Sequence, residues 1–219
     1  MNTNKKAELI NSLLQYVTQN KQDKMNAVIA NRTRYVTVVM EDLFQPHNAS
    51  AALRTCDIFG VQDVHVVEGL NKFKAIPTIA MGSGKWVDVH TSPSIVESIT
   101  HLKAQGYKIV ATTPHTDSYS LPFLPLDCKV ALVFGNEQTG LSDLAMQHAD
   151  MFVKIPMYGF VESFNVSVSV ALCLYDIITR LHQSDLPWRL SQEEAQDVML
   201  TWIRRVSKTA VLVEKSLEE

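Results

Sequence analysis

The chain has 219 residues, 46% of them hydrophobic and 20% charged, and it carries a formal net charge of −3. This near-average composition excludes a fibrous or intrinsically disordered protein and predicts a conventional packed core. The net charge excludes a uniformly basic nucleic-acid-binding protein, and no apolar run approaches membrane-spanning length, so we expect no membrane partner.

The first predicted element is a helix over residues 3–19, in an N-terminal segment whose charge differs from that of the whole chain. Residues 1–34 hold six basic residues against two acidic ones, whereas residues 35–178 carry an acidic excess. Polyanion binding depends on such local patches rather than on the total charge. Taken alone, however, this segment is better explained as an ordinary solvated helix face.

From residue 35 onward, apolar runs alternate with amphipathic segments. Runs rich in β-branched residues predict six strands, at residues 35–40, 64–67, 87–89, 107–112, 130–134 and 151–155. The segments between them predict helices at residues 48–59, 94–105 and 141–148. This alternation predicts an α/β fold with a mainly parallel six-stranded sheet, and the continuous apolarity of the strands indicates helices on both faces.

Local signals place several helix ends. Asn48 fits an N-cap, Ser94 with Glu97 fits a capping box, and Gly106 stands where a glycine often ends a helix. Residues 166–170 alternate with period two, as in a strand, but the apolar run that follows favours a helix beginning near Asn165.

The last predicted element is a helix over residues 191–215, opened by a capping box at Ser191 and Glu194. Arg204, Arg205 and Lys208 are spaced closely enough to share one side of it. The elements thus divide the chain into a basic helical extension (1–34), an α/β domain (35–182) and a second helical extension (183–219).

Several common sites are excluded. Residues 41–47, after the first strand, contain no glycine, which argues against a Rossmann-type dinucleotide or methyltransferase site. Residues 81–86 lack the first glycine and the Ser or Thr of a phosphate-binding loop, and neither G-x-S-x-G nor H-E-x-x-H occurs. The three cysteines are far apart, and the polar N-terminus has no signal segment, so we expect a cytoplasmic protein with reduced thiols and no metal.

Two segments place charged residues in unusual surroundings. Arg54 lies in an otherwise apolar helix, so it needs a carboxylate or a phosphate, and Asp57 could supply an internal partner. Glu137 follows a strand within residues 135–140 (Gly-Asn-Glu-Gln-Thr-Gly). It is either a ligand-facing acid or a solvated acid in a tight turn.

A third segment, residues 155–171, is an apolar loop that leads into small and β-branched residues. A mostly apolar loop must be buried, and its few polar side chains, notably Ser163 and Asn165, then need partners. They either cap the following helix or hold a ligand.

In this order, residues 48–54, 135–140 and 155–165 resemble the three motifs of the SpoU family of RNA ribose 2′-O-methyltransferases, with Phe164 where leucine is usual. The resemblance implies a methyltransferase domain with a deep trefoil knot, acting as a homodimer. It also implies S-adenosylmethionine as the methyl donor, held largely by backbone groups of three loops. The positions that correspond to those loops include Thr112, Gly135, Ile155, Met157 and Phe164.

The resemblance further implies that Arg54 is catalytic. A free arginine is too strongly protonated to act as a simple base, so we hypothesise that it grips an RNA phosphate and polarises the 2′-hydroxyl. Asn48, Ser163 and Asn165 would orient the ribose and Arg54, and Glu137 would brace the loop or the partner subunit.

The helical extensions resemble the subgroup that methylates guanosine 18 of tRNA, with the tRNA-contacting residues expected to be Arg32, Arg34, Arg204, Arg205 and Lys208. A 2′-hydroxyl target restricts the substrate to RNA and excludes DNA. The alternatives are 2′-O-methylation of another RNA, either rRNA or the tRNA wobble position, and a non-catalytic RNA-binding protein with the same fold.

Overall fold

The computed structural model describes residues 3–114 and 118–218. The chain forms two compact units, one of residues Arg34–Trp188 and one built jointly from the two ends of the chain, up to Thr33 and from Arg189. Over the described ranges, no helix is long and apolar enough to cross a membrane.

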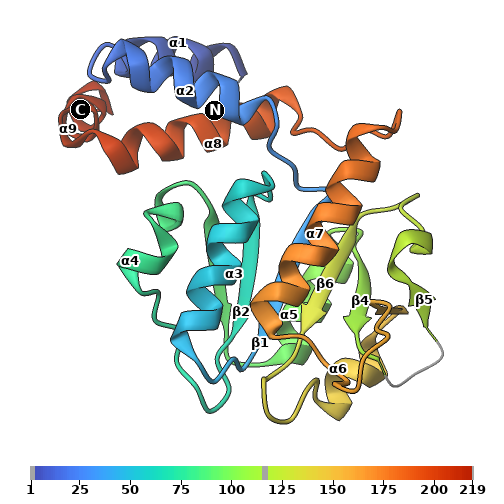
Figure 1. Cartoon of the computed structure of the whole chain (residues 1–219). Helices are drawn as coiled ribbons and strands as arrows, with labels where there is room; N and C mark the ends of the chain where they lie inside the picture. Colours follow the sequence, from blue (N-terminus) through green and yellow to red (C-terminus); the bar gives the residue numbers. More distant parts are fainter. Residues whose placement is uncertain (1–2, 115–117, 219) are drawn as a thin grey trace. The chain divides into compact units, whose positions relative to one another are not determined.

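The larger unit is built on a parallel sheet of seven strands in the order β3-β2-β1-β6-β4-β7-β5 (Figure 1). The strands are β1 (Val36–Glu41), β2 (Asp63–Val67), β3 (Asp88–Ser92), β4 (Lys108–Thr112), β5 (Tyr119–Ser120), β6 (Val130–Phe134) and β7 (Met151–Lys154). The parallel sheet is confirmed, but the predicted number of six strands is wrong. The additional strand, β5, has two residues at the sheet edge, which is too short to give a periodic pattern.

Helices cover both faces of this sheet (Figure 1). On one face lie α3 (Pro46–Ile58) and α7 (Val166–His182), and on the other lie α5 (Ile95–Ala104) and α6 (Asp143–His148). In β1, Val38 and Met40 belong to the core beneath α3 and α7, whereas Val39 belongs to the core beneath α5 and α6. Both faces of the strand are therefore buried, which accounts for its continuous apolarity.

Three short elements complete the larger unit. They are α4 (Pro77–Ala80) and the 3₁₀ turns η1 (Ser83–Lys85) and η2 (Leu121–Phe123). Each of them is too short for helical periodicity to reveal it in the sequence.

Some of the helix ends predicted from local sequence signals are confirmed by the structure, and others are wrong. Gly106 has φ +84° after α5, and Asn165 caps α7 by accepting a hydrogen bond from the amide of Ser167, so both predictions are confirmed. Ser94 is the N-cap residue of α5, but its side chain makes no cap bond, so the predicted capping box is wrong.

Asn48 is not an N-cap either, because α3 begins two residues earlier. Pro46 occupies the first turn of α3, and Gln45 precedes it as the N-cap residue. Proline favours this position because its fixed φ is already helical and its missing N–H would have had no partner there. The side chain of Asn48 thereby lies inside the first turn, free to bond to other parts of the chain.

The unit formed by the chain ends contains α1 (Thr3–Leu14), α2 (Gln19–Ile29), α8 (Gln192–Val206) and α9 (Lys208–Glu218). The capping box at Ser191 and Glu194 is confirmed. The two continuous helices predicted over residues 3–19 and 191–215 are wrong, because each segment is broken. Ser207 adopts an extended conformation between α8 and α9, and its hydroxyl accepts from the amide of Ala210.

Candidate active site

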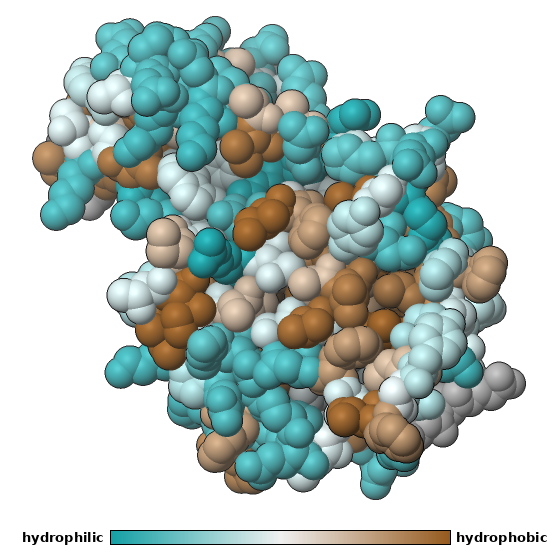
Figure 2. Space-filling model, in the orientation of Figure 1, coloured by the Kyte–Doolittle hydropathy of each residue, from teal (hydrophilic) through white to brown (hydrophobic). Residues whose placement is uncertain are grey.

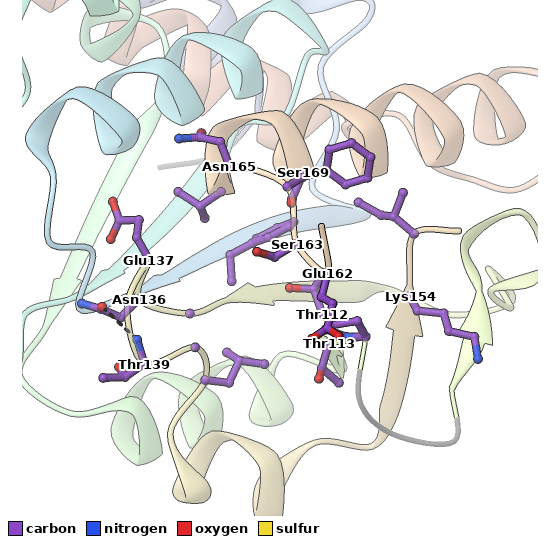
Figure 3. Close-up of a pocket in the computed structure, with 18 of the residues that line it drawn as sticks. Thr112, Thr113, Asn136, Glu137, Thr139, Lys154, Glu162, Ser163, Asn165 and Ser169 are labelled. Carbon is purple, nitrogen blue, oxygen red and sulfur yellow. Dashed lines mark hydrogen bonds between the residues drawn. The ribbon is translucent and has the colours of Figure 1, made fainter. Parts of the chain in front are cut away.

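A cavity of about 760 Å³ lies at the carboxyl ends of β4, β6 and β7, and the loops that follow these strands form most of its wall (Figure 3). Parallel α/β sheets commonly bind ligands at this edge, and the volume is typical of a small-molecule site. Figure 3 shows Thr112, Thr113, Glu162 and Ser163 on one side of the cavity and Asn136, Glu137 and Thr139 on the other.

The loop after β6 is tightly folded. Asn136 and Gly140 exchange two backbone hydrogen bonds of 2.9 Å, and Gly140 has φ +72°. A Cβ on Gly135 would lie 2.3 Å from the carbonyl carbon and oxygen of Gly140, so no side chain fits there. Glycine is therefore required at 135, where the loop closes on itself at the cavity wall.

Glu137 ties this loop to the start of α3. Its carboxylate accepts hydrogen bonds from Asn48 Nδ2 (2.7 Å) and from the backbone amides of Phe44 (2.8 Å) and Gln45 (3.2 Å). Burial alone would raise the pKa of Glu137, but the hydrogen bonds from Asn48 and the amides outweigh burial and lower the pKa below its ordinary value. Glu137 is thus an ionised brace rather than a solvated turn residue.

Asn48 continues this connection toward α7. Its Oδ1 accepts from Asn165 Nδ2 at 3.1 Å, while Asn165 Oδ1 accepts from both the amide and the hydroxyl of Ser167. The bonded series Glu137–Asn48–Asn165 therefore joins the three polar segments that lie far apart in the sequence. All three of its members line the cavity.

Arg54 lies on α3 outside the residues that line the cavity, and its side chain is exposed. It forms neither an ion pair nor a hydrogen bond with any residue that the structure describes, so the internal pairing with Asp57 is not present. The guanidinium is therefore available to an external anion.

The remaining predicted cofactor-binding positions all line the cavity, namely Thr112, Gly135, Ile155, Met157 and Phe164, and Ser163 lies among them. Thr112 Oγ1 donates to the carbonyl of Val133 at 2.8 Å, which turns its hydroxyl toward β6 rather than into the cavity. Among the described residues, no group of three or more His, Cys, Asp or Glu side chains could hold a metal ion.

The five basic residues predicted to contact RNA are in diverse environments. Arg34 pairs with Asp63 (2.7 Å) in the larger unit. In the terminal unit, Arg32 is 1% exposed with its guanidinium 5.3 Å from the ring centroid of Trp202.

Arg204 forms a two-bond ion pair with Glu214 (2.8 and 2.5 Å). Arg205 and Lys208 are exposed, but Arg205 lies in the last turn of α8 and Lys208 opens α9. The prediction that these three residues share one helix is therefore wrong.

Comparison with known proteins adds independent information. Residues 35–175 match the SpoU rRNA Methylase family. The chain is 40% identical over 205 residues to the tRNA (guanosine(18)-2′-O)-methyltransferase of Borreliella burgdorferi, covering 94% of each chain. The chain belongs to the SpoU methylase family.

Solved structures agree with this membership of the SpoU family. The Aquifex aeolicus TrmH/SpoU tRNA modifying enzyme superposes with a TM-score of 0.77 at 30% identity, over 85% of this chain and 96% of that one. The SpoU methyltransferase AviRb from Streptomyces viridochromogenes, solved in complex with AdoMet, shares the fold with a TM-score of 0.64 at 23% identity, over 71% of this chain and 64% of that one.

The cavity fits the methyl donor that SpoU membership implies. Its wall combines apolar side chains such as Ile155 and Met157 with neutral polar ones such as Thr113. The close approach of Gly135 to Gly140 also leaves main-chain groups, rather than a side chain, at that point of the wall. A mainly apolar wall with a few placed polar groups is typical of sites for small molecules of this size.

Several lining residues were not predicted as site residues, including Gln45, Thr139, Lys154 and Ser169. Gln45 lines the cavity because it is the N-cap residue of α3, which begins at Pro46. The proline could have placed the predicted start of this helix two residues earlier. Ser169 lies one helical turn after Asn165, so the amphipathic pattern of α7 could have found it.

Proposed function

We propose that this protein is an S-adenosylmethionine-dependent tRNA 2′-O-methyltransferase that modifies the ribose of guanosine 18. The observation that carries the proposal is the bonded series Glu137–Asn48–Asn165 at the edge of the cavity. This series unites the three segments that resemble the family motifs. The name of the Borreliella burgdorferi relative supports the choice of tRNA and of guanosine 18.

The methyl donor is proposed to lie in the cavity, held by the segments that contain Thr112, Gly135, Ile155, Met157 and Phe164. When bound, it supplies a methyl group already activated by a sulfonium. The chain itself then has two tasks, namely to orient the ribose hydroxyl and to assist the loss of its proton. Positioning alone can supply much of the rate for such a transfer.

Arg54 is proposed to be the catalytic residue. Its exposed guanidinium can grip an RNA phosphate with two hydrogen bonds and polarise the neighbouring 2′-hydroxyl, with the phosphate assisting proton loss. Asn48 lies on the same helix and is fixed by Glu137, while Ser163 and Asn165 face the same cavity. These residues would orient the ribose relative to Arg54.

The terminal unit is proposed to bind tRNA. We assign residues 35–182 to the methyltransferase domain and residues 1–34 and 183–219 to RNA-binding extensions. Exposed basic residues of the terminal unit support this role, and they include Lys5, Lys21, Lys24, Arg205 and Lys208. We also propose a cytoplasmic location, because tRNA is modified where it is made and used.

A homodimer and a trefoil knot are proposed on different grounds. Apolar or aromatic side chains are exposed on α3 and α7, with Ile58 67%, Tyr175 64% and Val168 43% exposed. Figure 2 shows hydrophobic residues gathered on the part of the surface where Figure 1 draws α7. Such a patch favours a second copy as its cover. The knot is proposed from membership of the SpoU family.

The test of the function is incubation of the purified protein with labelled S-adenosylmethionine and unmodified total tRNA, followed by nucleotide-level mapping. We expect one methylated ribose, at guanosine 18, and no labelling of tRNA in which that ribose is 2′-deoxy. Methylation of the wobble ribose instead, or labelling of rRNA in a parallel incubation, would show that another RNA position is the substrate. Absence of transfer, with intact tRNA binding, would favour the non-catalytic alternative.

Sedimentation at micromolar concentration tests the homodimer.

A further inference from the structure

Glu41, the last residue of β1, is a buried acid whose bonding partners belong to the cavity wall. Its side chain is only 6% exposed. One carboxyl oxygen accepts from the hydroxyl of Ser142 at 2.6 Å, and the other accepts from the backbone amide of Ser142 at 3.0 Å. Glu41 forms no ion pair within the ranges that the structure describes. Burying such a group is unfavourable unless its hydrogen bonds are made, so the Ser142 contact is a strong local restraint.

Ser142 is at the end of the loop that follows β6. Its hydroxyl oxygen also accepts from the amide of Ala145 and so caps α6. The Glu41 contact therefore fixes the point at which the loop turns into helix.

The other end of the same loop is fastened to the residue next to Glu41. Asn136 Nδ2 donates to the carbonyl of Asp42 at 2.6 Å. Asp42 has φ +49°, an unusual conformation for a residue other than glycine, and its carboxylate accepts from the amide of Asn71 at 2.7 Å. Residues 41 and 42 thus hold both ends of the loop, and its members between Asn136 and Ser142 all line the cavity.

We propose that Glu41 is a positioning residue for the methyl donor, acting through Ser142 to set the direction of the backbone amides and carbonyls of residues 135–142. This inference rests on the proposed function, since it takes S-adenosylmethionine as the ligand of the cavity. The Asn136–Gly140 bonds close the middle of this short loop, and Glu137 ties it to α3, whereas the end that enters α6 is held by the contact between Ser142 and Glu41. Small displacements of groups that hold a reactant have large effects on binding and rate.

The direct test is the Glu41→Gln variant. An amide group keeps the size of the carboxyl group, but its Nε2 is a donor that faces the Ser142 hydroxyl, which must rotate to accept, so the charge-assisted bond from that hydroxyl is lost. We expect the dissociation constant for S-adenosylhomocysteine, measured by isothermal titration calorimetry, to rise about tenfold, the size of one such hydrogen bond. The KM for S-adenosylmethionine should rise in parallel, while the KM for tRNA stays unchanged.

Two variants of Ser142 test whether Glu41 acts through that residue. Ser142→Ala should reproduce the loss of affinity, and Ser142→Thr, which keeps the hydroxyl, should restore most of it. The double variant Glu41→Gln with Ser142→Ala should bind no more weakly than the poorer single variant, because both changes remove the same contact. If Glu41→Gln does not fold, the Ser142→Ala and Ser142→Thr pair carries the test.

Glu68→Gln is the control. Glu68 also accepts a backbone amide, that of Phe73 at 2.9 Å, but in a loop that does not line the cavity. The affinity of the Glu68→Gln variant for S-adenosylhomocysteine should equal that of the wild type.

The outcomes separate this inference from the proposed function. If the wild type itself gives no heat with S-adenosylhomocysteine, the proposed function fails. If the wild type binds but Glu41→Gln binds within twofold of it, Glu41 has no positioning role. Equal losses of donor and tRNA binding, accompanied by a lower Tm without ligand, would show that Glu41 merely stabilises the fold and would overturn the inference.

Discussion

The cavity edge of the larger unit and the helices of the terminal unit use charged side chains in opposite ways. At the cavity, Glu137 is held by three donors and thereby fixes Asn48, while Arg54 stays exposed with its guanidinium unused by the described residues. In the terminal unit, Arg32 is buried against Trp202 and Arg204 pairs with Glu214. The position of a basic residue in the fold, and not its charge alone, therefore decides whether it serves internal packing and pairing or stays open to solvent.

The largest expected effect tests the exposed arginine. Arg54→Ala should lower turnover by about 10²-fold or more, because a positioned group that assists proton transfer is lost. Binding of S-adenosylhomocysteine should stay near the wild-type level, since Arg54 does not line the cavity. Single-turnover methylation of tRNA measures the first quantity and calorimetry the second.

Lys103→Ala is a suitable control for Arg54→Ala, because Lys103 is a basic residue that pairs with Asp150 elsewhere in the larger unit. Its turnover should be close to that of the wild type. Near-normal turnover of Arg54→Ala itself would remove Arg54 from the mechanism.

The buried arginine should behave differently. Arg32→Ala should reduce the free energy of unfolding by about 2 kcal/mol, because it removes a buried side chain and its contact with Trp202. Urea denaturation measures this change, and Lys24→Ala, an exposed change on α2, should leave stability nearly unaltered. A selective loss of tRNA affinity at unchanged stability would instead make Arg32 an RNA contact.

The contribution of the Glu137–Asn48 hydrogen bond to stability can be tested through its dependence on pH. Asn48→Ala removes a donor from Glu137 and should lower stability by about 1–2 kcal/mol at neutral pH. Because the folded pKa of Glu137 is depressed, its contribution is present above the unfolded pKa and is lost as the pH falls through the folded one. The difference between Asn48→Ala and the wild type should therefore shrink below about pH 4. A difference that stays constant down to pH 3 would exclude Glu137 as the source.

The smallest effect is expected from the exposed basic residues of the terminal unit. Replacing both Arg205 and Lys208 by alanine should weaken tRNA binding several-fold and reduce the slope of log affinity against log salt by about two. Filter binding between low and physiological salt measures the slope. An unchanged slope would place the RNA contacts elsewhere.

Much of the fold followed from short-range patterns. The central strands β1 and β6 were predictable because burial on both faces requires nearly unbroken apolar residues. The caps at Asn165 and Ser191 were predictable because each bonds to an amide two or three residues away. The two-residue strand β5 and the break at Ser207 were not, since neither leaves a periodic signal.

For the site, the sequence by itself determined which residues are candidates, because glycines, acids and amides at strand ends have few structural reasons to occur in apolar surroundings. Only the tertiary structure decided their partners. Glu137 meets Asn48 across 89 positions of the chain, and Glu41 meets Ser142 across 101. Hydrogen bonds over such separations depend on the order of strands in the sheet, which local propensity does not encode. Burial of Arg32 and exposure of Arg54 were decided in the same way, by which helices pack around each side chain.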